Sequence, residues 1–224
     1  ADANPRCAVA QADVMMRLAD KLMEICSILL YPMLMPMYGM VLFCCAVGEK
    51  YPEISLAYWL VSMGGTLILT LVIPFLLLVF MRHKGYIDSL HISDSKQRTM
   101  PYIYTLVCYV FWGYFLHMVL KLPPFMLLIA VGAIIALLSV TVINYWWKIS
   151  AHMTGIGGLF GGICSYGLYY STLPLYVVMV VLVLVLLLMY ARIHQKAHSP
   201  MQVVCGFLLG LLSTFIPNWI VYHA

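Results

Sequence analysis

The segment Ala191–Gln202, ARIHQKAHSPMQ, is a basic, histidine-bearing interruption between two long apolar runs. The preceding run, Leu175–Tyr190 (LYVVMVVLVLVLLLMY), and the following run, Val203–Val221, contain no charged residue. Runs of about 20 apolar residues are typical of membrane-spanning helices, so we expect the interruption at a membrane surface or at the mouth of a cavity. Its side chains that can bind phosphate or transfer protons are Arg192, His194, Lys196 and His198.

The composition of the whole chain agrees with a membrane protein. Hydrophobic residues make up 64% and charged residues 9% of the 224 residues, and the mean hydropathy is +0.99. Soluble domains carry about 25% charged residues. We therefore predict an all-α integral membrane protein, a bundle of about seven (six to seven) transmembrane helices.

The order of the apolar runs gives the predicted domain organisation. Residues 1–23 are mixed polar and are expected to form an N-terminal interfacial segment, and residues 24–224 a single transmembrane domain. The predicted spans are 24–47, 55–81, 102–120, 124–146, 153–172, 175–190 and 203–221. Within the first span, Tyr31–Met37 (YPMLMPM) predicts a kink or an unwound turn. A bent lipid-facing helix is the simpler interpretation, and a functional break is the alternative.

Counting membrane crossings places three polar segments, 82–100, 147–152 and 191–202, on one side of the membrane. Ten of the twelve Lys and Arg residues and five of the seven histidines lie on that side. Arginine offers a planar fork to phosphate oxygens and lysine a mobile charge. Histidine can attack phosphorus or protonate a leaving group. The three segments therefore predict a phosphate site at one mouth of the bundle.

Small residues predict where helices pack closely. Gly157/Gly161, Gly158/Gly162 and Gly206/Gly210 are each spaced four residues apart, which lets neighbouring helices approach one another. The helix start after His152 offers a second interpretation, because its backbone N–H groups can add to a phosphate site.

No metal site is expected. The seven cysteines lack CxxC or other ligand spacing and are interpreted as structural. His194 and His198, four residues apart, are an alternative metal pair, but neither an acidic nor a cysteine partner is near in sequence.

Three motifs resemble the signatures of the type-2 phosphatidic acid phosphatase superfamily. The third signature resembles the segment in which Arg192 is followed, after five residues, by His198 and Ser-Pro. The second signature, Pro-Ser-Gly-His, resembles Ile149-Ser-Ala-His152. Lys96, Arg98 and Pro101 look like a compressed first signature. The resemblance covers about residues 94–210 and implies a phosphatase-like core at about 94–222.

The resemblance implies hydrolysis of a lipid phosphate or diphosphate through a phosphohistidine, with no metal or other cofactor. By position, His198 would be the nucleophile and His152 the general acid. The groups that would hold the phosphate oxygens are Lys96, Arg98, Ser150 and Arg192. Lys148 is a further candidate for holding the phosphate because it is near these residues in the sequence, although it belongs to no motif. The candidate substrates are phosphatidic acid, phosphatidylglycerol phosphate, an isoprenyl diphosphate and a lipid A phosphate.

One departure from the family pattern lies at Gln202, where the third signature has Asp. Gln can accept a hydrogen bond and orient the imidazole, but it supplies no negative charge. In a serine-protease triad, replacing Asp by the neutral amide costs roughly 10⁴ in rate. Three explanations remain open. Another acid could replace the missing carboxylate, and the candidates are Asp88, Asp94 and Glu24. Otherwise the enzyme is slow, or the protein is not an enzyme. Asp94 is therefore a possible orienting residue beside Gln202.

Other functions compete with the lipid phosphatase. A non-catalytic relative would bind or move a lipid phosphate in the same pocket. A membrane prenyltransferase is disfavoured because the chain has no Asp-rich diphosphate and Mg²⁺ motif. Arg192 and Lys196 are also typical of interfacial anchors, and His198 of a capping or interfacial residue. The expected partners are the bilayer and a lipid phosphate, and no nucleic acid.

The two indications of membrane orientation disagree. Ten basic residues against two put the motif side in the cytoplasm. Without Lys96, Arg98, Lys148, Arg192 and Lys196 the count is five against two. The family resemblance implies an active site facing the periplasm or exterior. We follow the resemblance and expect a multi-pass protein of a bacterial inner membrane.

Overall fold

The computed structural model describes residues 5–48, 55–89, 92, 96–122, 124–170 and 175–224, with the backbone alone at 5–13, 47–48 and 96. Every element in these ranges is helical. The elements are α1 (Pro5–Leu29), η1 (Pro32–Leu34), α2 (Met35–Gly48), α3 (Leu56–Leu67), η2 (Ile68–Val72), α4 (Ile73–His83), η3 (Lys96–Arg98), α5 (Thr99–Tyr114), η4 (Phe115–Val119), α6 (Pro124–Ile143), α7 (Ala151–Tyr170), α8 (Leu175–His194) and α9 (Pro200–His223).

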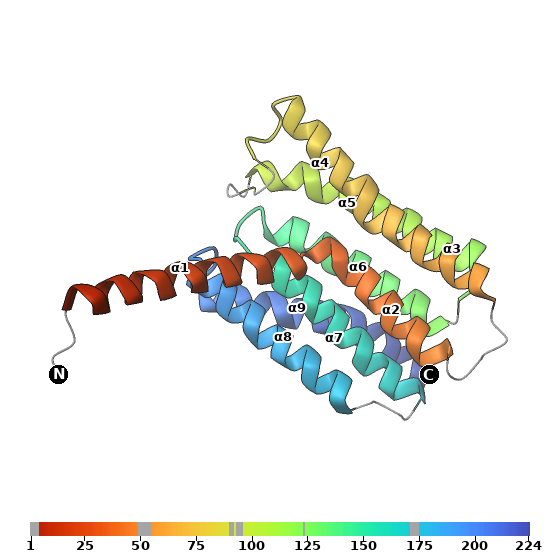
Figure 1. Cartoon of the computed structure of the whole chain (residues 1–224). Coiled ribbons are helices and arrows are strands. Elements are labelled where there is room, and N and C mark those ends of the chain that lie inside the picture. Colours follow the sequence, from red (N-terminus) through yellow and green to blue (C-terminus); the bar gives the residue numbers. More distant parts are fainter. Residues whose placement is uncertain (1–4, 49–54, 90–91, 93–95, 123, 171–174) are drawn as a thin grey trace.

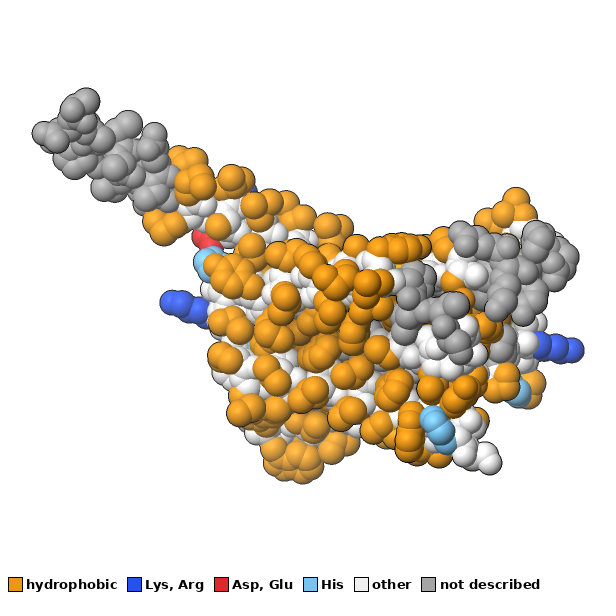
Figure 2. All heavy atoms as spheres, turned by 90° about the horizontal axis from the view of Figure 1, so that it is seen from below, with side chains coloured by type: hydrophobic (Ala, Val, Ile, Leu, Met, Phe, Trp, Pro, Cys, Tyr) orange, Lys and Arg blue, Asp and Glu red, His pale blue; other side chains and the backbone are white. Residues whose placement is uncertain are grey.

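The helices are those of a multi-pass membrane protein. Five are long and apolar enough to cross a membrane: α3–α4 taken together, α5 with η4, α6, α8 and α9. The bent pair α1 and α2 makes a sixth if it is counted as one span. Hydrophobic side chains cover the face seen in Figure 2, and few charged ones interrupt it. α7 is 20 residues long and lies among these helices, but its glycines lower its hydropathy, so the predicted count of seven stays a prediction.

The first predicted span is broken where the prolines indicated. α1 and α2 meet at an angle of 43° across η1. The predicted boundary at residue 23 falls inside α1, which continues to Leu29 and projects away from the bundle towards its N-terminus (Figure 1). Residues 5–23 of the predicted N-terminal segment are therefore the first part of a longer helix.

Glycines bring α7 and α9 into backbone contact. A Cβ at Gly210 would overlap the Thr154 carbonyl, and one at Gly157 the Phe207 carbonyl. A Cβ at Gly206 would lie 2.7 Å from the Ser150 carbonyl oxygen. The two helix starts are therefore adjacent, and the Ser150 N–H donates to the Gln202 carbonyl (3.4 Å). This packing places the second and third sequence motifs side by side.

The membrane helices also contain two irregular turns that the sequence did not indicate. η2 and η4 are π-helical segments, each of five residues. The indole N–H of Trp112 donates to the Thr66 hydroxyl (3.1 Å), which joins α5 to α3 in the same region. In the turn before α6, Lys121 has a φ of 50°.

Candidate active site

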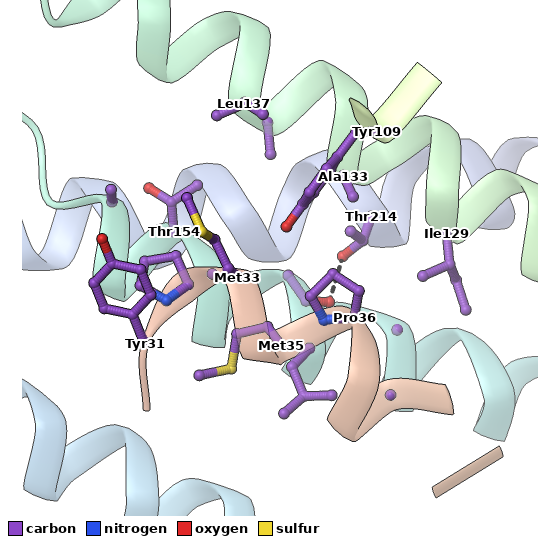
Figure 3. A pocket seen from close by; sticks show the side chains of 18 of the residues that line it. Tyr31, Met33, Met35, Pro36, Tyr109, Ile129, Ala133, Leu137, Thr154 and Thr214 are labelled. Atoms are coloured by element: carbon purple, nitrogen blue, oxygen red, sulfur yellow. Dashed lines mark hydrogen bonds between the residues drawn. The ribbon is translucent and has the colours of Figure 1, made fainter. Parts of the chain in front are cut away.

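A cavity of about 290 Å³ lies inside the bundle between α2, α5, α6 and α7. The prolines and methionines around η1 line one wall, and Ile129, Ala133 and Leu137 of α6 line the opposite one (Figure 3). The basic and histidine side chains of the lining are Arg98, His152, Arg192 and His198. Residues predicted from three separate motifs therefore share one cavity.

Arg192 is the most deeply buried cation of this group. Only 3% of the residue is exposed, although it lies in the last turn of α8. One guanidinium nitrogen, Nη1, donates to the Gln195 amide oxygen at 3.1 Å, while Nε is buried and has no hydrogen-bond partner in the described part of the chain. No ion pair of Arg192 with a carboxylate occurs among the described residues. An interfacial anchor would extend into the head groups, so the structure does not support that alternative for Arg192.

His198 lies in the turn between α8 and α9 and is 7% exposed. Burial, together with the charges of Arg192, Arg98 and Lys148, lowers its pKa to about 4, against a weaker opposing effect of the hydrogen bond to Gln202. Burial, Arg98 and Arg192 also lower the pKa of Lys148. His198 is therefore neutral at pH 7, as a nucleophile must be.

Gln202 fixes the orientation of the His198 ring. Its side-chain oxygen Oε1 lies 3.2 Å from His198 Nδ1. An amide oxygen only accepts hydrogen bonds, so Nδ1 carries the proton and Nε2 keeps its lone pair. The same oxygen accepts the Ser199 N–H (3.1 Å), and Ser199 Oγ accepts the Gln202 N–H, which forms a capping box at the start of α9. The capping box thus holds the acceptor in place.

His152 faces a tyrosine that the sequence did not single out. Its ring lies edge-on to Tyr31, with 5.3 Å between the centroids. Tyr31 lies at the break between α1 and η1 and lines the cavity (Figure 3). The break is therefore part of the candidate site, and the interpretation of a purely lipid-facing bend is wrong. The proline-rich break was the available signal.

Arg98 is held by two groups near the start of α5. Its Nε and Nη2 donate to the carbonyl oxygen of Ile92 at 2.8 and 2.6 Å. The Tyr102 side chain also interacts with the Arg98 guanidinium. Tyr102 lines the cavity one helical turn after Arg98, and this spacing was the signal that could have found it.

The other predicted site residues lie elsewhere. Ser150 is fully buried, lines no part of the cavity, and accepts the Met153 N–H (3.5 Å) at the start of α7. The expectation that its hydroxyl holds a phosphate oxygen is therefore unsupported. Lys96 lies in η3, but its side chain and all of Asp94 lie outside the described residues.

Neither of the other two acids suggested for the missing Asp contacts His198. Asp88 accepts a hydrogen bond from the Gln97 amide (2.7 Å), and Glu24 is exposed on α1. Lys196 is exposed in the turn, and its φ is 53°. His194, the other half of the alternative metal pair, lies 2.8 Å from Asp20 of α1. The described residues contain no group of three metal-ligating side chains.

Comparison of the chain with protein-family models, with curated proteins and with solved structures found no match.

Proposed function

We propose that this protein is an integral-membrane lipid phosphatase that hydrolyses a phosphate monoester or diphosphate on a lipid head group through a phosphohistidine at His198. The observation that carries the proposal is the buried Arg192, joined by Arg98 and Lys148 around a neutral imidazole with no carboxylate among the described residues to balance them. Burying an unbalanced cation is costly. A phosphate, with a charge of about −2, supplies the missing counter-charge.

The proposed reaction has two steps, each with a defined nucleophile. In the first, the lone pair of His198 Nε2 attacks phosphorus, the bond from phosphorus to the lipid oxygen breaks, and His152 gives its proton to that oxygen. In the second, His152 takes a proton from water, the water oxygen attacks phosphorus, and the bond to Nε2 breaks. Inorganic phosphate leaves and both histidines return to their starting states.

The cations serve both steps. Arg192 and Arg98 neutralise the phosphate oxygens as negative charge shifts among them in the transition state. Their guanidinium planes favour the paired oxygens of a phosphate. Tyr31 contacts the ring of the proposed proton donor and so limits where His152 can turn.

A second candidate function is a non-catalytic protein that binds or moves a lipid phosphate. Gln202 favours it, because the phosphohistidine carries positive charge that a neutral amide cannot balance. Binding needs only the cations, which both functions share. The two functions therefore differ in whether His198 and His152 react.

Phosphate release by the purified protein tests the proposal. The protein is given a panel of lipid phosphates and diphosphates in EDTA, beside His198→Ala, His152→Ala and the matched control His194→Ala, which alters an exposed histidine of the same segment outside the cavity. We expect release by the wild type and the control only. Release no higher than that of His198→Ala on every substrate would refute the enzyme, and a requirement for added divalent metal would refute the phosphohistidine route.

A gain-of-function variant separates a slow enzyme from a binding protein. Gln202→Asp restores the carboxylate of the resembled motif, and we expect it to raise the rate of phosphate release. A variant that still binds lipid phosphate but releases none would favour the binding protein.

We also assign the cavity mouth to the outer face of a bacterial inner membrane, following the motif resemblance. Lys196→Cys puts a thiol on the exposed turn beside the site. An impermeant thiol reagent added to intact cells is expected to label it. Labelling only after the cells are opened would reverse the assignment.

A further inference from the structure

The cavity extends far beyond the cationic groups that the proposed reaction uses. Along α7 its lining runs from His152 to Tyr166. These residues are fourteen positions apart, which is about 21 Å at the helical rise of 1.5 Å per residue. The hydrocarbon core of a bilayer is about 30 Å thick. The cavity therefore continues from the phosphate site through most of the bundle, and we call this extension the chamber.

The walls of the chamber are apolar even where the sequence is polar. The hydroxyls of its lining threonines are bonded to backbone carbonyls: Thr105 to Pro101 (2.8 Å), Thr154 to Ser150 (3.0 Å) and Thr214 to Gly158 (3.0 Å). Met33, Ala133 and Leu137 add apolar surface, and the Tyr109 hydroxyl points inward (Figure 3). Ordered water needs two to four polar partners, so these walls suit an apolar occupant.

Aromatic rings close the far end of the chamber. The Phe125 ring lies 6.3 Å from Tyr166, 5.4 Å from Tyr170 and 5.8 Å from Phe43 between centroids. Trp112 packs into the same cluster and is 4% exposed. An apolar chain that enters from the cationic end therefore meets a packed floor.

The volume of the chamber suits one chain better than two. A water molecule occupies about 30 Å³ in the liquid, and a methylene group is of similar size. A cavity of about 290 Å³, which includes the cationic end, then has room for on the order of ten such groups. Two acyl chains lying side by side need more room than this.

We propose that the chamber holds the single hydrocarbon chain of a lipid phosphate or diphosphate, and that the Phe125 floor limits the length of chain accepted. This rests on the proposed function for the phosphate end only. The substrate class is then single-chain lipids, isoprenyl or alkyl, and two-chain phospholipids are excluded.

Filling the chamber tests the proposal. Ala133→Phe puts a ring on the chamber wall, and Val131→Phe makes the same change on α6 at a residue 44% exposed and outside the lining. Each variant is assayed on alkyl and isoprenyl phosphates of rising length and on phosphatidic acid. We expect Ala133→Phe to lower the ratio of long-chain to short-chain kcat/KM at least tenfold, and Val131→Phe to leave it unchanged. Phe125→Ala is expected to raise the length limit.

A binding measurement keeps the chamber distinguishable from the reaction. Native mass spectrometry of the His198→Ala protein measures retention of the same lipids without turnover. Length-dependent retention that Ala133→Phe abolishes supports the chamber even if no phosphate is ever released. Equal effects of Ala133→Phe and Val131→Phe, or retention of phosphatidic acid equal to that of single-chain lipids, would overturn it. Phosphate release with no dependence on chain length would overturn the chamber and leave the phosphatase intact.

Discussion

The pKa of His198 gives the sharpest test of the site, through the variant Gln202→Glu. Glutamate has the shape of glutamine, so an oxygen stays at the position 3.2 Å from His198 Nδ1 and can still accept the Ser199 N–H. The Ser-x-x-Glu pattern also preserves the capping box. A negative charge in the first turn of α9 is favourable by about 0.3–1 kcal/mol. The variant thus changes the charge at this position and little else.

An opposite charge this close raises the pKa of a histidine by about 1–3 units. Starting from about 4, the variant should titrate between about 5 and 7. Each unit corresponds to about 1.4 kcal/mol of preference for the charged ring. The same preference stabilises the positively charged phosphohistidine, so we expect the rate at pH 7 to rise by about 10- to 1,000-fold.

The pH dependence of kcat/KM reports the pKa values of the free enzyme. The acidic limb due to His198 should lie near pH 4 in the wild type and move upward by 1–3 units in Gln202→Glu. The second ionisation of the phosphate contributes a limb as well, but it is the same for both proteins. An unmoved acidic limb, or one near pH 6.5 in the wild type, would refute the burial and charge reasoning at His198.

Stability should follow the same pKa. His198 has a pKa of about 4 in the folded protein and about 6.5 when unfolded, so between these values the unfolded chain binds more protons. The free energy of unfolding should therefore rise as pH rises from 4 to 6.5, by about 3 kcal/mol at most. Thermal unfolding of the wild type and of His198→Ala across this range measures the difference.

Three further predictions concern other residues. Arg192→Met removes a buried cation that no described carboxylate balances. We therefore expect the melting temperature to stay the same or rise, and the stabilisation by added vanadate to be lost. A large fall in the melting temperature would contradict this. Tyr102→Phe removes the hydroxyl that interacts with Arg98 and should lower kcat/KM about tenfold, with thermal stability as the control. An unchanged kcat/KM would contradict this. Gly210→Ala places a Cβ against the Thr154 carbonyl and should destabilise the protein by several kcal/mol. The control Gly64→Ala, where a Cβ would have nothing within 4 Å, should be neutral or stabilising by about 0.5–1 kcal/mol. Equal melting temperatures of the two variants would contradict the close packing of α7 and α9.

Much of the fold was predictable because membrane helices are recognised in a sequence by the length and hydrophobicity of their segments. The broken first span followed from Pro32 and Pro36, and the close packing of α7 on α9 followed from glycines spaced four apart. The convergence of Arg98, His152, Arg192 and His198 followed from counting crossings, since each crossing reverses the chain.

The parts that were not predicted depend on three-dimensional contacts. Tyr31 meets His152 because η1 packs on Gly155, where a Cβ would lie 3.1 Å from the Pro32 Cα, and no periodicity in the sequence encodes that approach. Ser150 matched its motif by position, yet the approach of Gly206 buries it under α9. The π-helical turns η2 and η4 have no composition that distinguishes them from α-helix.

Only part of the role of Gln202 could be predicted from the sequence. In the phosphatase motif an acid stands at this position, and here it is replaced by glutamine. The segment Ser199-Pro-Met-Gln202 is also a Ser-x-x-Gln capping box with proline in the first turn. The structure joins the two, because the side-chain oxygen that completes the cap also accepts the hydrogen bond from His198 Nδ1–H. A neutral residue can therefore orient the ring without a carboxylate.

Trapping the phosphoenzyme tests the central claim most directly. The purified protein is mixed with a lipid phosphate in EDTA, quenched in base within the first turnover, digested and examined by mass spectrometry. We predict one added phosphoryl group on His198 in the wild type, which disappears as inorganic phosphate is released and is absent in His198→Ala. Phosphate release with no phosphoryl group on His198 at any time, or with the group on another residue, would contradict the account.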